Sequence, residues 1–302
     1  MGSQTIGLGT QIFQYCMTGI TIGSIYALVA LGFNMIYNVT EIINFAQGEF
    51  VVLGGLMMVT LSVSLGIPFW AAFPLTVLFV AISGFLLDRF AIRPLKNPSV
   101  TTMIIATIAA SILIKGIAMF AWGKNPLDLP AFTGRTPIEL GGVVIQPQAL
   151  WVIAFLVLVV LVMVYFFERT IMGKAMMACA DNPMAASLVG INVNRMILMA
   201  FAISASVGAV AGIVITPISL MEYDRGAMLG LKGFSAVILG GLGSFQGAVI
   251  GGLLIGLLES LGAGLISSAY KDAFALLLLF ILLVVKPSGI IGSAQVARRK
   301  KL

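Results

Sequence analysis

The chain has 302 residues, of which 60% are hydrophobic and only 9% are charged, and its net charge is +6. A soluble domain carries roughly 25% charged residues because its surface faces water, so this composition excludes a soluble globular protein and indicates an integral membrane protein. Histidine is absent and there are two cysteines, which gives no disulfide framework and no cluster typical of a metal centre or a membrane-embedded enzyme. We therefore expect no catalytic residue and no metal. No nucleic-acid partner is expected either, because the basic residues gather in the C-terminal tail without an accompanying aromatic–basic groove.

Apolar stretches that could span a membrane recur along the chain. A spanning helix needs about 20 apolar residues. In lipid a helix satisfies its backbone hydrogen bonds within one segment, whereas a β-barrel would show alternating strands of ~10 residues. We predict one membrane permease domain over 1–302, an all-α polytopic bundle of about eight to ten transmembrane helices with broken or re-entrant segments. The apolar stretches lie near 11–37, 42–66, 68–87, 99–121, 150–167, 196–220, 244–268 and 273–285, with a shorter glycine-rich piece at 227–243.

Lysine and arginine orient the later spans, because cytoplasmic loops carry an excess of both. The loops 88–98 and 168–195 and the tail 286–302 are basic and are predicted to be cytoplasmic, the tail beside anionic lipid. Acidic residues balance the basic ones in 122–149 and 221–226, which we expect outside. The first 88 residues contain no lysine or arginine. The side of the N-terminus therefore stays open: nine spans place it outside and eight place it inside.

Two polar interruptions, 38–49 and 227–247, break the apolar pattern. Broken helices at membrane depth are tolerated where they are buried in protein or line a cavity, so both are candidate elements of a translocation path. Glu49 at membrane depth costs ~2.5–3.5 kcal/mol unless it is paired or hydrated. Either it lies with Glu41 at a water-facing boundary, or this break lines or supports the path. The candidate pathway residues are Asn44, Gln47, Gly48, Glu49, Gly240, Gly241 and Gly243.

Glycines spaced by four residues share one helix face and let a second helix approach closely. We expect them to pack helices together, with a dimer face or a flexible gate as alternatives. Among the charges in or near apolar stretches, Lys115 is expected to extend toward the external end of its span, while Lys232 and Glu259 could pair across the bundle. The glycine sets are Gly19/Gly23, Gly208/Gly212 and Gly243/Gly247/Gly251.

The loop 168–195 contains the signals of a short helix. Asp181 or Asn182 can cap its start, with Pro183 in the first turn, and Gly190 is placed to end it. This pattern predicts an amphipathic helix that docks into a groove of a partner protein, or alternatively lies on the lipid surface. Its apolar side at helical spacing consists of Met184, Ala185, Leu188 and Val189.

Several motifs resemble those of a known family. The run Met184-Ala185-Ala186-x-x-x-Gly190 is similar to the E-A-A-x-x-x-G loop of ABC importer permeases, with Met184 in place of the acidic residue. Three separated stretches resemble the permeases of branched-chain amino acid ABC transporters, and the resemblance extends from about Thr18 to Gly292. These stretches are 173–192, Ile43-Asn44-Phe45-Ala46-Gln47-Gly48-Glu49 and Val237-Ile238-Leu239-Gly240-Gly241-Leu242-Gly243-Ser244.

The resemblance implies a permease subunit of a binding-protein-dependent importer in the bacterial inner membrane, for branched-chain amino acids. It implies three kinds of partner: a second paralogous permease, two cytoplasmic ATPase subunits and a periplasmic substrate-binding protein. The chain has no G-x-x-x-x-G-K-[ST] phosphate loop, so ATP-Mg is expected on the partner ATPases and no cofactor on this chain. By resemblance, the 182–191 helix is the coupling helix that contacts the ATPase through Asp181, Pro183, Met184, Ala185, Ala186, Leu188 and Gly190.

Two alternatives remain open at this stage. One is an ABC permease for urea, amides or other carboxylates. The other is a self-contained secondary transporter, which should keep essential ionisable groups inside the membrane and should transport without an ATPase.

Overall fold

The computed structural model describes residues 8–95, 99–134, 136–140, 143–285 and 289–291, so all of the predicted basic tail 286–302 except 289–291 lies outside the described residues. In chain order the main elements are α1 (Leu8–Thr40), α2 (Gln47–Val59), α3 (Phe69–Leu87), α4 (Val100–Trp122), β1 (Ile138–Leu140), β2 (Val143–Ile145), α5 (Pro147–Arg169), α6 (Ile171–Asp181), α7 (Pro183–Leu188), α8 (Val193–Ile215), α9 (Arg225–Gly240), α10 (Phe245–Leu265) and α11 (Lys271–Val285). Short π-helical turns, Thr60–Ser64 and Asp88–Ile92, extend α2 and α3, and a 3-10 turn, Ser268–Tyr270, precedes α11.

The predicted all-α polytopic architecture is confirmed. Within the described part of the chain, seven helices are long and apolar enough to cross a membrane: α1, α2, α3, α4, α5, α8 and α10, with α2 and α3 counted together with their π-helical turns. The helices α9 and α11 are also apolar but shorter, at 16 and 15 residues. Each predicted apolar stretch coincides with one of these nine helices, because long apolar runs are a strong signal for a membrane helix.

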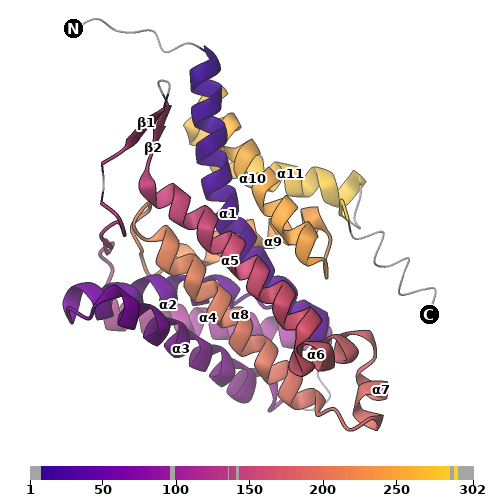
Figure 1. The fold of residues 1–302 in the computed structure, drawn as a ribbon. Helices are drawn as coiled ribbons and strands as arrows, with labels where there is room; N and C mark the ends of the chain where they lie inside the picture. The colour runs from indigo at the N-terminus through magenta and orange to yellow at the C-terminus, as the bar shows by residue number, and fades with distance from the viewer. Residues whose placement is uncertain (1–7, 96–98, 135, 141–142, 286–288, 292–302) are drawn as a thin grey trace, which may run out of the picture.

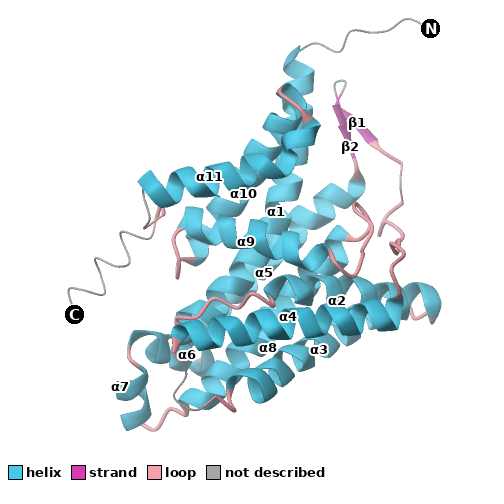
Figure 2. Ribbon diagram, turned by 180° about the vertical axis from the view of Figure 1, so that it is seen from behind, coloured by secondary structure: helices cyan, strands magenta, loops and turns pink. Residues whose placement is uncertain are grey.

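Helix α1 is the central helix of the bundle (Figure 1) and contacts α10 along much of its length, as well as α5, α8 and α9. Its residues from Gly19 to Val39 are largely buried. By contrast, α3, α4 and α5 lie on the outside, because most of their residues are not buried. Their exposed apolar side chains suit contact with lipid. Helix α1 is enclosed by its neighbours from about Gly19 onward, while its N-terminal turns project from the bundle (Figure 2).

Glycines allow the central helices to approach backbone to backbone. A Cβ atom added to Gly256 of α10 would overlap the backbone of Gly23 in α1, and one on Gly212 of α8 would overlap the carbonyl of Val51 in α2. The close packing predicted for Gly19/Gly23 and Gly208/Gly212 is therefore confirmed. Helices in lipid depend on such close contact because no hydrophobic force drives them together.

The third glycine set needs a correction. Gly247 and Gly251 do face the backbone of α9, but Gly243 does not share their helix face, because it lies before α10 in a turn with φ +86°. Only glycine adopts this conformation at low cost. Its role is to turn the chain rather than to pack a helix.

The N-terminal end of α1 lies beside the β1–β2 hairpin (Figure 1). The Gln14 side chain pairs with the backbone of Val144 in β2: Nε2 donates to the carbonyl at 2.9 Å, and Oε1 accepts from the N–H at 3.0 Å. The hairpin belongs to the loop 122–149, which the charge pattern places outside, whereas α7 lies at the far end of the molecule. This end of α1 is therefore on the same side as the predicted external loop.

The glycine contacts can be tested by adding a single methyl group. Gly256→Ala places a Cβ against the α1 backbone, and we expect the unfolding free energy to fall by about 1–3 kcal/mol. Gly116→Ala is the matched control, because nothing lies within 4 Å of that position. Unfolding of the purified protein in detergent measures both. Equal stability of the two variants would contradict the packing described here.

Candidate functional site

The first predicted break lies between α1 and α2, at residues 41–46, and it is buried in protein. Asn44 closes the turn by accepting a hydrogen bond from the N–H of Ala46 at 3.0 Å. The Gln47 amide binds Ser204 of α8: its Oε1 accepts from the Ser204 hydroxyl at 2.6 Å, and its Nε2 donates to the Ser204 carbonyl at 3.2 Å. The Ser204 hydroxyl also lies 2.7 Å from the carbonyl of Gly32 in α1. The start of α2 is thus fixed to both α1 and α8.

Gly48 and Glu49 lie against the first turns of α9. Gly48 contacts the backbone of Gly226 and Gly230. Glu49 is only 1% exposed, and its Oε1 accepts a hydrogen bond from the Ser111 hydroxyl of α4 at 3.0 Å. The reading of Glu49 as a water-facing boundary residue is therefore wrong, because α4 and α9 cover it. Glu41, in contrast, is exposed.

The second break, residues 241–244, separates α9 from α10. Gly241 and Gly243 have positive φ values of 103° and 86°, and Ser244 caps α10 by accepting from the N–H of Gly247 at 3.0 Å. The Asn34 side chain, fully buried in α1, spans this turn: its Nδ2 donates to the Ser244 carbonyl at 2.8 Å, and its Oδ1 accepts from the Gly243 N–H at 3.0 Å. Asn34 is not among the predicted pathway residues, although an asparagine within a long apolar run is a usable signal.

The structure brings both breaks to α9 and to one stretch of α1. Gly48 and Glu49 meet the start of α9, and Gly240, the last residue of α9, leads into the second break. Gln47 approaches Gly32, two residues before Asn34. The predicted pathway residues therefore form two groups that border the same short helix.

Lys232 and Glu259 form an ion pair inside the bundle, which confirms the expected partnership. Lys232 Nζ lies 3.0 Å from Glu259 Oε1 and 2.6 Å from Asp272 Oδ1. The Tyr26 hydroxyl donates to Glu259 Oε2 at 2.8 Å and accepts from Lys232 Nζ at 3.1 Å. Lys271 Nζ lies 3.4 Å from Glu259 Oε1. Two positive and two negative groups thus balance within a junction of α1, α9, α10 and α11.

The short helix predicted in the loop 168–195 is α7. Its N-cap is Asn182, whose Oδ1 accepts from the N–H of Ala185 at 3.0 Å, while Asp181 is the last residue of α6. Pro183 occupies the first helical position as predicted. Gly190, with φ +89°, follows the end of the helix as predicted.

Most of the predicted contact residues on α7 point outward. Met184, Leu188 and Val189 are 77%, 84% and 77% exposed, and Pro183, Ala185 and Gly190 are exposed as well. Ala186 is the exception, because it is only 3% exposed and belongs to the apolar core. Ala186 therefore anchors α7 to the bundle, while the other side of the helix is uncovered.

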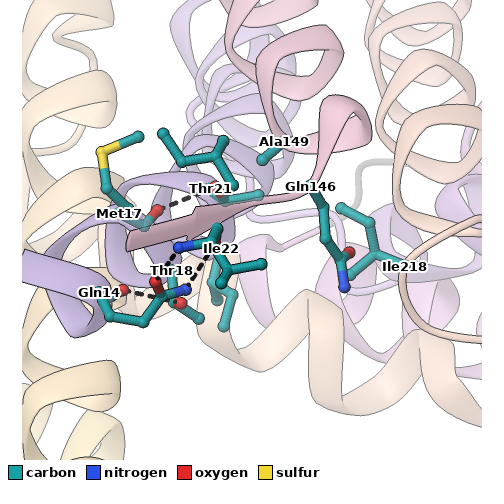
Figure 3. Close-up of a pocket in the computed structure, with 10 residues that line it drawn as sticks. Gln14, Met17, Thr18, Thr21, Ile22, Gln146, Ala149 and Ile218 are labelled. Carbon is teal, nitrogen blue, oxygen red and sulfur yellow. Dashed lines mark hydrogen bonds between the residues drawn. The ribbon is translucent and has the colours of Figure 1, made fainter. Parts of the chain in front are cut away.

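A cavity of about 270 Å³ opens beside the hairpin, between the N-terminal half of α1, β2 and the start of α5 (Figure 3). The Gln14–Val144 hydrogen bonds form part of its wall. Its polar side chains are uncharged, namely Gln14, Thr18, Thr21 and Gln146. In the predicted orientation, this uncharged cavity opens on the external side of the membrane.

An enclosed helical bundle with two broken helices and an uncovered helix in a basic loop is the arrangement of a membrane permease. Residues 15–283 match the family described as branched-chain amino acid transport system / permease component. The chain belongs to this family, as its motifs had indicated. It is a multi-pass protein of the bacterial inner membrane.

Curated relatives of similar length support this assignment. The chain is 33% identical to the high-affinity branched-chain amino acid transport system permease protein LivH of Salmonella typhimurium, over 94% of this chain and 97% of that protein. It is 32% identical to the corresponding protein BraD of Pseudomonas aeruginosa, with the same coverage. A more distant relative is the ribose import permease protein RbsC of Haemophilus influenzae, at 26% identity over 87% of this chain and 81% of that protein.

The buried ion pair allows a double-mutant test. Lys232→Met or Glu259→Gln alone removes one contact of the buried pair, while Asp272 still contacts Lys232 and Lys271 still contacts Glu259. We expect each single variant to lower the unfolding free energy by about 1–3 kcal/mol. The double variant should lose clearly less than the sum, because contacting residues couple. Additive losses in detergent unfolding would show that the two side chains do not interact.

The role of the Asn34 side chain at the second break can also be tested. Asn34→Leu leaves the Gly243 N–H and the Ser244 carbonyl without this partner, at an expected cost of about 1–3 kcal/mol in unfolding free energy. Asn38→Leu on the same helix is the control, because among the described residues no hydrogen bond of the Asn38 side chain is found. A loss no larger for Asn34→Leu than for Asn38→Leu would refute the role given to Asn34.

Proposed function

We propose that this chain is the permease subunit of a binding-protein-dependent ABC importer for branched-chain amino acids, driven by ATP-Mg on two cytoplasmic ATPase subunits. A second paralogous permease would complete the pore, and a periplasmic binding protein would deliver the cargo. The family is described as a permease component of a transport system, which supports partners that supply the energy. The chain itself carries no proposed catalytic residue.

The observation that carries this proposal is the uncovered apolar surface of α7, formed by Met184, Leu188 and Val189. The helix is held in shape by its own Asn182 cap and by Gly190, so it does not need the partner in order to fold. A preformed helix with exposed apolar residues suits docking into a groove of another protein. We assign this role to the ATPase, with Met184 replacing the usual acidic residue by an apolar contact.

A chain of contacts connects α7 with the second break. Helix α7 joins α6, whose Gly173 packs against the backbone of Phe166 and Phe167 at the end of α5. The Phe167 ring stacks on Phe245 in the first turn of α10, with 4.9 Å between the ring centroids. A displacement of α7 can therefore act on the α9–α10 turn through packed side chains.

The proposed cargo rests on the relatives that are named for branched-chain amino acid transport. The chain also has a relative that is named for ribose import. The shared fold alone therefore does not identify the cargo as an amino acid. Ligand binding by the soluble partner protein would decide between branched-chain amino acids and urea, amides or other carboxylates. Direct binding of L-leucine, L-isoleucine and L-valine, with urea and acetamide as comparisons, is the measurement.

Coupling to the ATPase can be tested on the exposed side of α7. Leu188→Asp places a charge in the apolar surface, and we expect binding of the ATPase to weaken about tenfold or more, with loss of ATP-dependent uptake in liposomes. Because Leu188 is 84% exposed, the variant should insert and fold normally. Copurification with the ATPase measures the effect.

The control is Ile138→Asp, which adds the same charge to an exposed residue of β1 at the opposite end of the molecule. It should keep the ATPase bound. If Leu188→Asp copurifies and transports like the parent, α7 is not the coupling helix. If the chain transports with no ATPase present, the secondary-transporter alternative holds.

A further inference from the structure

Helix α7 is joined to α8 by residues 189–192, and this connection is held in shape by hydrogen bonds. The N–H of Ile191 donates to the carbonyl of Ala186 at 3.0 Å. Asn192 then caps α8 by accepting from the N–H of Arg195 at 3.1 Å. A short connection closed at both ends bends little, so a displacement of α7 is passed on to the first turn of α8.

An arginine at the end of α3 binds this first turn of α8. The Nη2 of Arg93 donates to the carbonyl of Asn194 at 2.9 Å. Both residues belong to loops that the charge pattern places in the cytoplasm, and the contact shows that they lie at the same end of the molecule. Arg93 thus ties α8 to α3 directly beside the connection to α7.

Asp88 holds the guanidinium of Arg93 in this position. The Asp88 side chain is only 1% exposed, and its Oδ2 lies 3.2 Å from Arg93 Nε. The N–H of Arg93 also donates to the Asp88 carbonyl at 2.9 Å, which closes the π-helical turn at the end of α3. One guanidinium can serve Asp88 and Asn194 together, because it presents five N–H donors in a rigid fork.

Helices α3 and α8 also meet deeper in the bundle. A Cβ atom added to Gly84 of α3 would overlap the carbonyl of Phe201 and the side chain of Ala205 in α8. This close contact and the hydrogen bond from Arg93 are separate points of attachment between the same two helices. Two such points hold the helices at a fixed angle, whereas the contact at Gly84 alone would leave the start of α8 free to swing.

Neutralisation of a buried acid explains only part of this arrangement. Asp88 would be costly inside the bundle without a positive partner, and the ion pair with Arg93 supplies one. That ion pair is made by Nε, however, and it does not require Nη2 to reach α8. The hydrogen bond to Asn194 is therefore the part of the arrangement that charge balance leaves unexplained.

We propose that Arg93 is a positioning residue of the transport cycle: held by Asp88, it fastens the start of α8 to α3, so that α3 and α8 move together when the ATPase displaces α7. The inference rests on the proposed function. It adds a second route to the one through Phe167 and Phe245, which leads to α10. Without the tie, α7 and α8 would move and leave α3 behind, and ATP would be hydrolysed without matching transport.

The test measures L-leucine uptake per ATP hydrolysed by the complete transporter in liposomes, with its ATPase, second permease and binding protein. Arg93→Met removes both contacts of the guanidinium, and we expect uptake per ATP to fall about threefold or more while the ATPase stays bound. Arg89→Met is the matched control. It removes the same charge from the same turn, but Arg89 is exposed and forms no ion pair or hydrogen bond among the described residues, so the parent ratio should be kept.

The double variant Asp88→Asn with Arg93→Met separates the tie from charge balance, because it leaves no unpaired charge at this position and still lacks the bond to Asn194. We expect its uptake per ATP to stay as low as in Arg93→Met. Recovery of the parent ratio in the double variant would show that Arg93 only neutralises Asp88 and would overturn the proposal. An unchanged ratio in Arg93→Met would overturn it as well. A parent complex that fails to assemble or to take up L-leucine would instead refute the proposed function, so the two failures are distinguishable.

Discussion

The architecture depends on the contact of helix backbones at glycine. In α1 and α10, Gly23 and Gly256 leave no room for a Cβ atom, and the same is true where α2 crosses α8 at Gly212. Close approach does more than add van der Waals contact. It brings polar side chains from different helices within hydrogen-bond distance inside the bundle, where they can bond to one another and to backbone groups near the breaks.

Side-chain amides join both breaks to neighbouring helices. Gln47 binds the hydroxyl and the carbonyl of Ser204, and Asn34 binds one backbone donor and one backbone acceptor of the α9–α10 turn. An amide suits this task because it carries a donor and an acceptor side by side and has no net charge to desolvate. Helix α9 lies between the two breaks, where it contacts α2 through Gly226 and Gly230 and is joined to α10 and α11 by Lys232.

Much of this could be predicted from sequence because it depends on local signals. Apolar runs gave the spans, and Pro183 and Gly190 delimited α7. The depth of single residues could not be predicted, since burial is decided by helices far away in the chain. Glu49 is covered by α4 and α9, and Ala186 turns inward while Leu188 turns outward. Asn34 and Ser204 were missed for the same reason: their partners lie 210 and 157 residues away. Lys232 and Glu259 were paired correctly because they are rare charges in apolar surroundings.

The Lys232–Glu259 pair also has a consequence for biogenesis. A lysine or an acidic residue at the centre of a single helix raises the free energy of inserting that helix from the translocon into lipid by ~2.5–3.5 kcal/mol. Lys232 lies in α9 and its partner Glu259 in α10, which follows directly in synthesis. Entry of α9 into lipid is therefore favoured only when α10 accompanies it, as a helical hairpin whose charges are already neutralised. We therefore expect the ion pair to favour insertion of α9 and α10 as one unit.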